Sequence, residues 1–231
     1  MGNEVKKDSV LRRRPESWEI LLGIVIIVLG VLFEYIDTIG LGLGGPTGPD
    51  VFPPPIAQWD ASLLLAINPG LLSPIPSAFF GLVTHLGSTL AVVVFCIVLY
   101  WLGYRKEAVL ILTTVVIGTL IVAPLKIAVM RPRPYSTLSG VIPLDYESGS
   151  SFPSGHSERI FALAAVFPTR KSMKVLLLYL LSIAVAFSRI YVGVHYPLDV
   201  LVGVLIGLVV GKVTLRLQTR ILGVASRFVK L

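Results

Sequence analysis

Long apolar runs separated by short polar or Gly/Pro-rich segments dominate this chain of 231 residues. A membrane-spanning helix needs about 20 mostly apolar residues. Runs near or above this length lie close to 18–39, 76–103, 107–130, 155–168, 172–192 and 197–218. The pattern predicts an all-α polytopic membrane protein, a six-transmembrane-helix bundle. Because the fourth run is short, we expect its helix to begin below the membrane surface, covered by the segment 135–152.

The stretch between the first two runs has a different pattern. Gly and Pro are frequent between positions 40 and 55, which excludes a regular helix there. From Ile56 to Ile67, apolar residues return every three or four positions, and Trp59 is among them. This spacing predicts a short amphipathic helix that lies in the membrane interface.

Composition agrees with an integral membrane protein. The chain is 55% hydrophobic and 14% charged, and its mean hydropathy is +0.85. Its net charge of +7 does not indicate nucleic-acid binding, because the cations lie at the ends of apolar runs and no basic cluster interleaves with aromatic residues. Cys96 is the only cysteine, so neither a disulfide framework nor a thiolate metal site is expected.

The positions of Lys and Arg predict the orientation in the membrane. With the N-terminus in the cytoplasm, 15 of the 20 Lys and Arg residues fall in cytoplasmic segments. The first run resembles a secretory signal but lacks a small-residue cleavage site, so we expect an uncleaved anchor. The predicted organisation is a cytoplasmic segment 1–17, a membrane domain 18–218 and a cytoplasmic tail 219–231. In the cytoplasmic membrane, the remaining cations then face the periplasmic or extracellular side.

Those remaining cations lie in or beside three short segments that hold most of the ionisable chemistry. In the first, Lys126 and Arg133 are seven positions apart, which places them on one face if a helix continues through both. An isolated pair of this kind is also typical of cations that extend toward a membrane boundary. We expect this boundary role for Arg131, which would lie on another face.

The second segment, Pro153-Ser154-Gly155-His156, lies where the fourth helix should begin. Free backbone N–H groups and the helix dipole make such a position suitable for an anion. Ser154 offers a hydroxyl donor, and Gly155 lets an anion approach the backbone. Simple N-capping also explains the serine and the glycine, but it does not explain an imidazole at a membrane surface.

The third segment contains Ser188-Arg189, followed by His195 and Asp199. A spacing of four residues on a helix brings a carboxylate beside an imidazole ring. The carboxylate would select one tautomer and leave the other ring nitrogen free as a nucleophile or base. A purely structural His–Asp pair has the same spacing.

Taken together, the segments favour chemistry on a tetrahedral oxyanion. Three cations and a helix N-terminus suit a phosphate, and two imidazoles allow one to attack while the other protonates a leaving oxygen. No cluster of carboxylates or cysteines in the sequence is suited to holding a metal, so we expect no metal and no cofactor.

The spacings Lys-x6-Arg-Pro (126–134), Pro-Ser-Gly-His (153–156) and Ser-Arg-x5-His-x3-Asp (188–199) resemble the signature of the type 2 phosphatidic acid phosphatase superfamily. The resemblance implies that His195 is the nucleophile, Asp199 its orienting partner and His156 the general acid. It also implies a set of phosphate-binding residues, namely Lys126, Arg133, Ser154, Gly155 and Arg189.

The resemblance implies an enzyme of the bilayer with a lipid phosphate substrate. We expect a phosphatase acting on an isoprenoid diphosphate or phosphate through a phosphohistidine. A phosphatidylglycerophosphate or phosphatidic acid phosphatase is the alternative. A non-catalytic lipid-binding or transport protein would not need the aligned histidines, and the soluble haloperoxidases of the superfamily do not match this hydropathy.

Five further residues complete the sequence-based picture. Glu158 and Arg159 follow the second segment, where small or apolar residues are usual in the superfamily. They predict an internal ion pair or a salt bridge to the overlying loop, or else contact with a second phosphate or a headgroup of the substrate. Asp145 and Glu147 are expected to be solvated loop charges. His85 is expected to be a packed polar residue of the second span.

Overall fold

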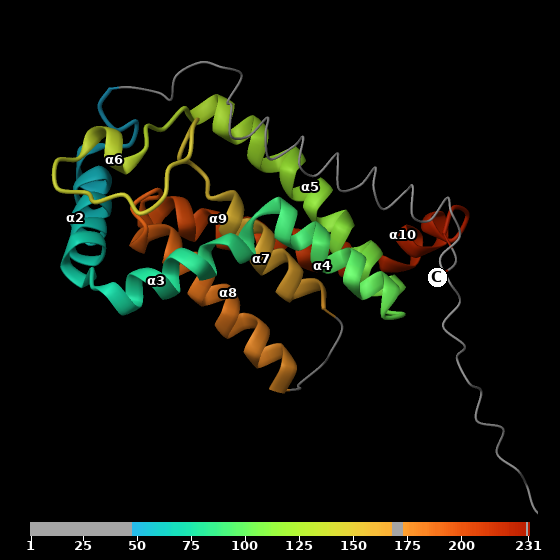
Figure 1. Ribbon diagram of the computed structural model, residues 1–231. Coiled ribbons are helices and arrows are strands. Elements are labelled where there is room, and N and C mark those ends of the chain that lie inside the picture. The colour runs from blue at the N-terminus through green and yellow to red at the C-terminus, as the bar shows by residue number, and fades with distance from the viewer. Residues whose placement is uncertain (1–47, 168–172, 230) are drawn as a thin grey trace, which may run out of the picture.

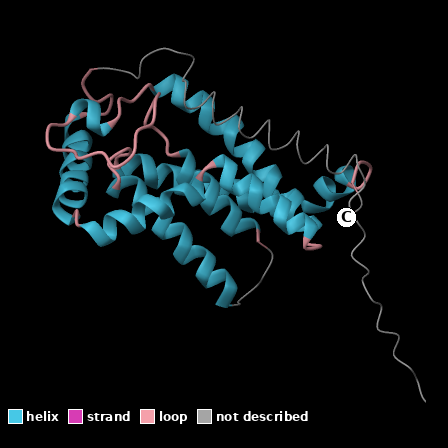
Figure 2. Cartoon of the chain, viewed as in Figure 1, coloured by secondary structure: helices cyan, strands magenta, loops and turns pink. Residues whose placement is uncertain are grey.

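The computed structural model describes residues 48–167, 173–229 and 231, and within them every regular element is a helix (Figures 1 and 2). The elements are α2 (Pro54–Leu71), α3 (Pro74–Val83), the 3₁₀ helix η2 (Thr84–Gly87), α4 (Thr89–Trp101), α5 (Arg105–Val129), α6 (Pro134–Thr137), α7 (Gly155–Val166), α8 (Met173–Tyr191), α9 (Pro197–Arg216) and α10 (Gln218–Ala225). The predicted all-α class is confirmed. The expected first span, 18–39, and the segment 1–17 lie outside the described residues.

Fewer than six helices in the described residues meet the length and hydropathy expected of a membrane span. Three stretches do so: Arg105–Thr137, Met173–Tyr191 and Pro197–Arg216. A fourth is added if the bent pair Pro74–Gly87 and Thr89–Trp101 forms one span. At 12 residues, α7 is too short to cross a bilayer alone, as its short apolar run predicted.

The expectation of one continuous helix over 76–103 is wrong. The chain breaks at η2 and Ser88, and the two halves meet at 65°. Ser88 begins α4 as its N-cap, with its Oγ accepting a hydrogen bond from Ala91 N at 3.1 Å. The local capping chemistry therefore overrides the uniform hydropathy of the run.

Close packing of α9 against α7 is achieved through glycines spaced four apart. A Cβ atom added at Gly203 would lie 2.4 Å from Ser154 O, and one at Gly207 would lie 2.3 Å from Glu158 O. Gly211 continues the same face. Small residues at this spacing let two helix backbones approach closely. As a result, the first turn of α7 lies directly against the first half of α9.

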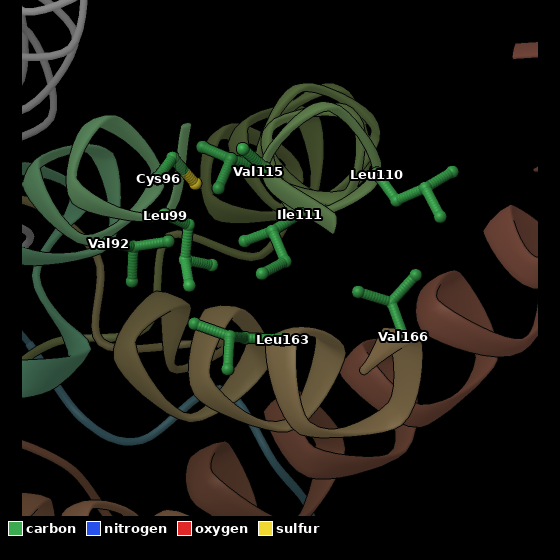
Figure 3. Packing of buried hydrophobic residues seen from close by; sticks show 9 residues of the cluster. Val92, Cys96, Leu99, Leu110, Ile111, Val115, Leu163 and Val166 are labelled. Carbon is green, nitrogen blue, oxygen red and sulfur yellow. The ribbon is translucent and has the colours of Figure 1, made fainter. Parts of the chain in front are cut away.

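An apolar cluster lies between α4, α5 and α7 (Figure 3). Its buried members include Val92 and Cys96 of α4, Ile111 of α5, and Leu163 and Val166 of α7. Cys96 is a free, buried thiol within this packing. This apolar packing holds α4, α5 and α7 together.

At one end of the bundle, far from α10, polar contacts replace apolar packing. There α2, α6 and the segment 138–154 lie together (Figure 1). α2 confirms the helix expected at 56–67, and it extends beyond both predicted ends. Asn68 of α2 donates to Ile142 O at 2.9 Å and to Tyr191 O at 2.7 Å, and it accepts from Ile142 N at 2.7 Å. This single side chain fixes the loop to both α2 and the end of α8.

Candidate active site

The first segment does not form one helical face. α5 ends at Val129, and Met130 adopts a left-handed conformation with φ 49°. Arg133 lies beyond this turn in extended backbone, as the N-cap residue of α6. The expected shared helical face of Lys126 and Arg133 is therefore wrong, although the change of direction still aims both toward the segment 138–154. Lys126 Nζ donates to Ser150 O at 3.2 Å.

The centre of the site is the carboxylate of Glu147. Arg133 NH1 lies 2.9 Å from Glu147 Oε2, and Arg189 NH2 donates to Oε1. The two imidazoles also face it: His156 Nδ1 is 3.6 Å from Oε1, and His195 Nε2 is 3.6 Å from Oε2. The prediction that Glu147 is a solvated loop charge is wrong, because segments far apart in the sequence converge on it.

Hydrogen bonding determines the tautomer of His195. Its Nε2 lies 3.1 Å from Arg133 NH1, and its Nδ1 lies 3.4 Å from Asp199 Oδ2. A guanidinium group can only donate, so the contacts with Arg133 and Asp199 favour a lone pair on Nε2 and a proton on Nδ1. His195 precedes α9, and Asp199 is in its first turn. Their contact therefore does not depend on a shared helix, contrary to the i, i+4 argument from the sequence.

Charges around the site shift the ionisation of its loop residues. Burial alone would raise the pKa of Glu147, but the guanidinium groups of Arg189 and Arg133 outweigh it and hold that pKa well below the usual range. Burial lowers the pKa of His195, and the nearby Arg133 lowers it further. The site thus favours an anion at its centre and a neutral His195.

The second segment begins a helix as predicted. Ser154 is the N-cap of α7, and its Oγ accepts from Ser157 N at 3.4 Å and contacts Ser157 Oγ at 3.0 Å. Ser154 N donates to Asp199 O at 3.0 Å, so the first turns of α7 and α9 are joined. His156 is 13% exposed and is directed at Glu147. The simpler capping role of Ser154 is confirmed; its contact with a phosphate stays a prediction.

The boundary role expected for Arg131 is wrong. Its side chain is completely buried, and it is surrounded by Asp50, Asp60 and Asp199 at 2.5 to 2.7 Å. The guanidinium also lies 3.7 Å from the centroid of the Tyr196 ring. A position facing the bilayer could not hold this cation without such partners, and α2 supplies one of them.

Glu158 and Arg159 are buried on different sides of α7. Arg159 Nε donates to Gly87 O at 3.0 Å, and its guanidinium lies beside Gly155. Glu158 packs against Gly118 of α5, and its Oε1 has no hydrogen-bond partner. Neither residue reaches Glu147 through a contact of the kind made by Arg133 or Arg189.

Several site residues were not identified by sequence reasoning. Thr84, in the break between α3 and α4, accepts a hydrogen bond from Arg189 NH1. Asp60 accepts from Leu198 N at 2.8 Å and is completely buried. A carboxylate within an amphipathic helix was the available signal for Asp60; no local pattern marked Thr84. His85, expected to be packed, is instead exposed.

Within the described ranges, no group of three or more His, Cys, Asp or Glu side chains is arranged to hold a metal ion. The three carboxylates that do meet, those of Asp50, Asp60 and Asp199, already enclose the guanidinium of Arg131. The cations and histidines around Glu147 can bind an anion in place of its carboxylate, with the His195 imidazole held next to that anion.

Comparison with known proteins identifies the family of this chain. Residues 107–222 match the sequence profile of the PAP2 superfamily, and this chain belongs to that superfamily. It is 39% identical over 72 residues to the putative undecaprenyl-diphosphatase YbjG of Escherichia coli (strain K12), covering 31% of this chain and 36% of YbjG.

Two further likenesses extend over more of the chain. It is 34% identical over 137 residues to phosphatidylglycerophosphatase B of Bacillus subtilis (strain 168), covering 52% of this chain and 64% of that relative. The fold is also similar, with a TM-score of 0.63 and 21% identity, to the transmembrane PAP2-type phosphatidylglycerolphosphate phosphatase from Bacillus subtilis, covering 90% of this chain and 98% of that one. The chain thus aligns with about a third and two thirds of the two sequence relatives. The superfamily and the names of these relatives support a phosphatase.

Proposed function

We propose that this protein is an integral membrane lipid phosphatase that hydrolyses an isoprenoid diphosphate or phosphate through a phosphohistidine intermediate. The observation that carries the proposal is the convergence of Arg133, Arg189, His156 and His195 on one carboxylate, that of Glu147. These groups would hold a substrate phosphate in its place, with Lys126, Ser154 and the Gly155 backbone N–H as additional donors.

In the first chemical step, His195 Nε2 attacks phosphorus and the bond from phosphorus to the leaving oxygen breaks. The leaving oxygen takes the bond's electron pair and a proton from His156, whose protonated form the incoming dianion favours. The Nδ1–H of the phosphorylated ring stays directed at Asp199, which stabilises the positive charge. The products of this half-reaction are the lipid alcohol or monophosphate and phosphohistidine.

In the second step, a water molecule attacks the phosphohistidine and gives a proton to His156. The P–N bond breaks, its electron pair returns to Nε2, and inorganic phosphate leaves. His195 recovers its neutral form, and His156 is again protonated for the next turnover. Each atom and proton is accounted for without a redox step.

Glu147 has to leave the centre of the site when a phosphate enters. Its side chain is 22% exposed, and it belongs to the segment 138–154 rather than to a helix. A phosphate dianion carries more charge and more acceptor oxygens than a carboxylate, so it can replace Glu147 between the same guanidinium groups. Glu147 then acts as an internal competitor that lowers the apparent affinity for substrate.

Two substrate classes have support. The similarity to a relative named as an undecaprenyl-diphosphatase favours an isoprenoid diphosphate. The longer alignment with phosphatidylglycerophosphatase B favours a glycerophospholipid phosphate as the second candidate. Arg159, beside Gly155, is the cation available for a second phosphate, with Glu158 as its neighbour on α7, and this position supports the diphosphate.

The test is the release of inorganic phosphate from a panel of lipid phosphates by the detergent-purified protein, with and without EDTA. We expect the highest kcat/KM on a polyprenyl diphosphate, no loss on chelation, and competitive inhibition by vanadate. A preference for phosphatidylglycerophosphate would establish the second candidate. No phosphate release from any member, or loss in EDTA restored by Mg²⁺, would contradict the proposed mechanism.

We further propose that both termini are cytoplasmic and that the site opens to the outer face. The distribution of Lys and Arg supports this orientation. Tyr146, 73% exposed beside the site, and Leu102, 61% exposed between α4 and α5, provide positions for a test. In a Cys96→Ala background, an impermeant thiol reagent should label Tyr146→Cys, but not Leu102→Cys, in intact cells. The reverse result would invert the orientation.

A further inference from the structure

Arg131 is not among the residues expected to bind phosphate, but the charged network around it indicates a role in catalysis. We propose that Arg131 is a positioning residue that aligns the His195 imidazole for attack by acting through Asp199. This inference rests on the proposed function, in which His195 is the nucleophile. It assigns a kinetic consequence to a cation that does not touch the substrate.

The guanidinium of Arg131 is held on every side. Its NH1 donates to Asp199 Oδ1 at 2.7 Å, and its NH2 lies 2.5 Å from Asp50 Oδ2 and 2.7 Å from Asp60 Oδ2. The rings of Tyr196 and Phe52 lie over its carbon, at 3.7 and 4.8 Å from their centroids. Since Arg131 is completely buried, it has no solvent-exposed alternative position.

The two oxygens of Asp199 have different partners, and this division gives Arg131 its influence. Oδ1 accepts from Arg131, while Oδ2 accepts from Tyr196 N at 2.9 Å and faces His195 Nδ1 at 3.4 Å. A carboxylate held at both oxygens cannot rotate about its Cβ–Cγ bond. Fixing Oδ1 therefore also fixes the direction from which Oδ2 meets the imidazole.

The segment before and within α2 stabilises the same geometry from the other side. Asp60 Oδ1 accepts from Leu198 N at 2.8 Å, one residue before Asp199, while its Oδ2 lies against Arg131. Asp50 completes the enclosure and is 16% exposed. Arg131 is thus the one cation that these three buried or partly buried carboxylates share.

Backbone contacts of Arg131 also reach the segment 138–154, at Ser150 and Ser151. Arg131 N donates to Ser150 Oγ at 3.0 Å, and Arg131 O accepts from Ser151 N at 2.8 Å. These bonds would survive a change of side chain. A substitution at Arg131 therefore tests the guanidinium itself, with the loop's attachment left in place.

A substitution at Arg131 should therefore change kcat without changing the affinity for the substrate or for phosphate. Arg131 lies on the side of Asp199 away from the Nδ1 contact, whereas Arg133 and Arg189 are the cations at Glu147. A change at Arg131 should slow phosphoryl transfer to His195. It should leave KM, and the Ki of inorganic phosphate, close to the values of the unaltered protein.

The experiment is a double-mutant cycle of Arg131→Lys and Asp199→Asn on the full-length protein in detergent. Arg131→Lys keeps the charge but loses the planar fork. We expect about a tenfold lower kcat, within the range of coupling between contacting residues. In the Asp199→Asn background, the same change should lower kcat by less than about twofold, because the path it acts through is already lost.

Two outcomes would overturn the inference. One is an additive cycle, in which Arg131→Lys costs the same with either residue at 199. The other is a rise in phosphate Ki that accounts for the lost activity, which would make Arg131 a binding residue. An unaltered protein without phosphatase activity, or an Asp199→Asn variant with full kcat, would instead contradict the proposed function.

A second cycle covers the case in which Arg131→Lys does not fold, as judged by thermal unfolding and size exclusion. Asp50→Asn perturbs the partly exposed edge of the same network. We expect it to lower kcat about two- to threefold when Asp199 is present, and to leave kcat unchanged when residue 199 is Asn. Couplings within one salt-bridge network, here through Arg131, are of this order. Equal effects in both backgrounds would overturn the inference in this arm too.

Discussion

Two clusters of buried charge lie next to each other in this protein, and they have opposite compositions. In the cation-rich cluster, Arg133, Arg189 and the two active-site histidines surround one carboxylate, Glu147. In the carboxylate-rich cluster, three aspartates surround one cation, Arg131. The His195–Asp199 contact joins them.

The clusters also differ in whether their central group can leave. Glu147 is 22% exposed and lies on a loop, while Arg131 is completely buried and lies just beyond the C-terminus of α5. Buried charges cost free energy unless they are paired, so an excess of cations around a displaceable anion is suited to exchanging it for another anion. An excess of carboxylates around an immovable cation is suited to holding geometry. Different cations thus serve the two tasks: Arg133 and Arg189 are placed to bind the substrate, and Arg131 is placed to align the nucleophile.

The largest expected effect comes from removing the group at the junction of the clusters. His195→Ala should lower kcat by at least about three orders of magnitude, because no nucleophile remains. Phosphate binding should persist, since Arg133 and Arg189 are unchanged. Single-turnover kinetics and mass spectrometry of acid-quenched enzyme measure this, with phosphate expected on His195 in the unaltered protein. Substantial residual turnover in the variant would rule out the phosphohistidine.

Removal of a cation from the cation-rich cluster should have the next largest effect. Arg189→Ala should reduce kcat/KM by about 10² to 10³, as expected when a donor to the reacting oxyanion is lost. It should also raise the Ki of phosphate, which separates it from a change at Arg131. Arg220→Ala, an exposed cation of α10, is the matched control and should leave both constants unaltered. Equal losses in the two variants would indicate a general effect of charge.

Neutralising the internal anion should act in the opposite direction. Glu147→Gln should lower the Ki of inorganic phosphate about three- to tenfold, because the loss of one competing charge pair is worth on the order of 1 kcal/mol. Asp145→Asn is the control, since Asp145 lies 3.6 Å from Arg189 without reaching the histidines. Weaker phosphate binding in Glu147→Gln would make Glu147 a part of the binding site rather than a competitor.

The pH dependence of that competition follows from the lowered pKa of Glu147. Its ion pairs are fully formed above the ordinary glutamate pKa, and they are lost only as pH falls through the lowered value. Glu147 should therefore stay ionised between about pH 6 and 8. Over this range, the ratio of the phosphate Ki of the unaltered protein to that of Glu147→Gln should stay constant. A ratio that collapses toward one at the acidic end of this range would show that Glu147 is protonated there.

The smallest expected effect concerns Arg159, which belongs to neither cluster. Arg159→Ala should lose about three- to fivefold more kcat/KM on an isoprenoid diphosphate than on the matching monophosphate, about the value of one additional charge-assisted contact. Parallel assays of the two substrates measure the ratio. Identical losses on both would return Arg159 to a structural role, through its bond to Gly87 O.

Much of the candidate site could be predicted because its chemistry is local in the sequence. Ser154 was expected at the start of a helix, and the structure makes it the N-cap of α7. His195 and Asp199 were expected to be in contact, and they are, at 3.4 Å. Apolar runs also located α5, α8 and α9 to within a few residues. These predictions depend on capping, short spacings and hydropathy, which neighbouring residues determine.

The partners of the buried charges could be known only from the tertiary structure. The amino-acid sequence alone indicates that this much ionisable chemistry in apolar surroundings must be paired, because an isolated charge in hydrocarbon costs several kcal/mol. It did not determine that Arg131 meets Asp60 of α2 or that Arg189 meets Thr84 and Glu147. Those contacts depend on the left-handed turn at Met130, the break between α3 and α4, and the path of the segment 138–154. Each brings together residues from distant parts of the chain, so no local pattern encodes which charge is paired with which.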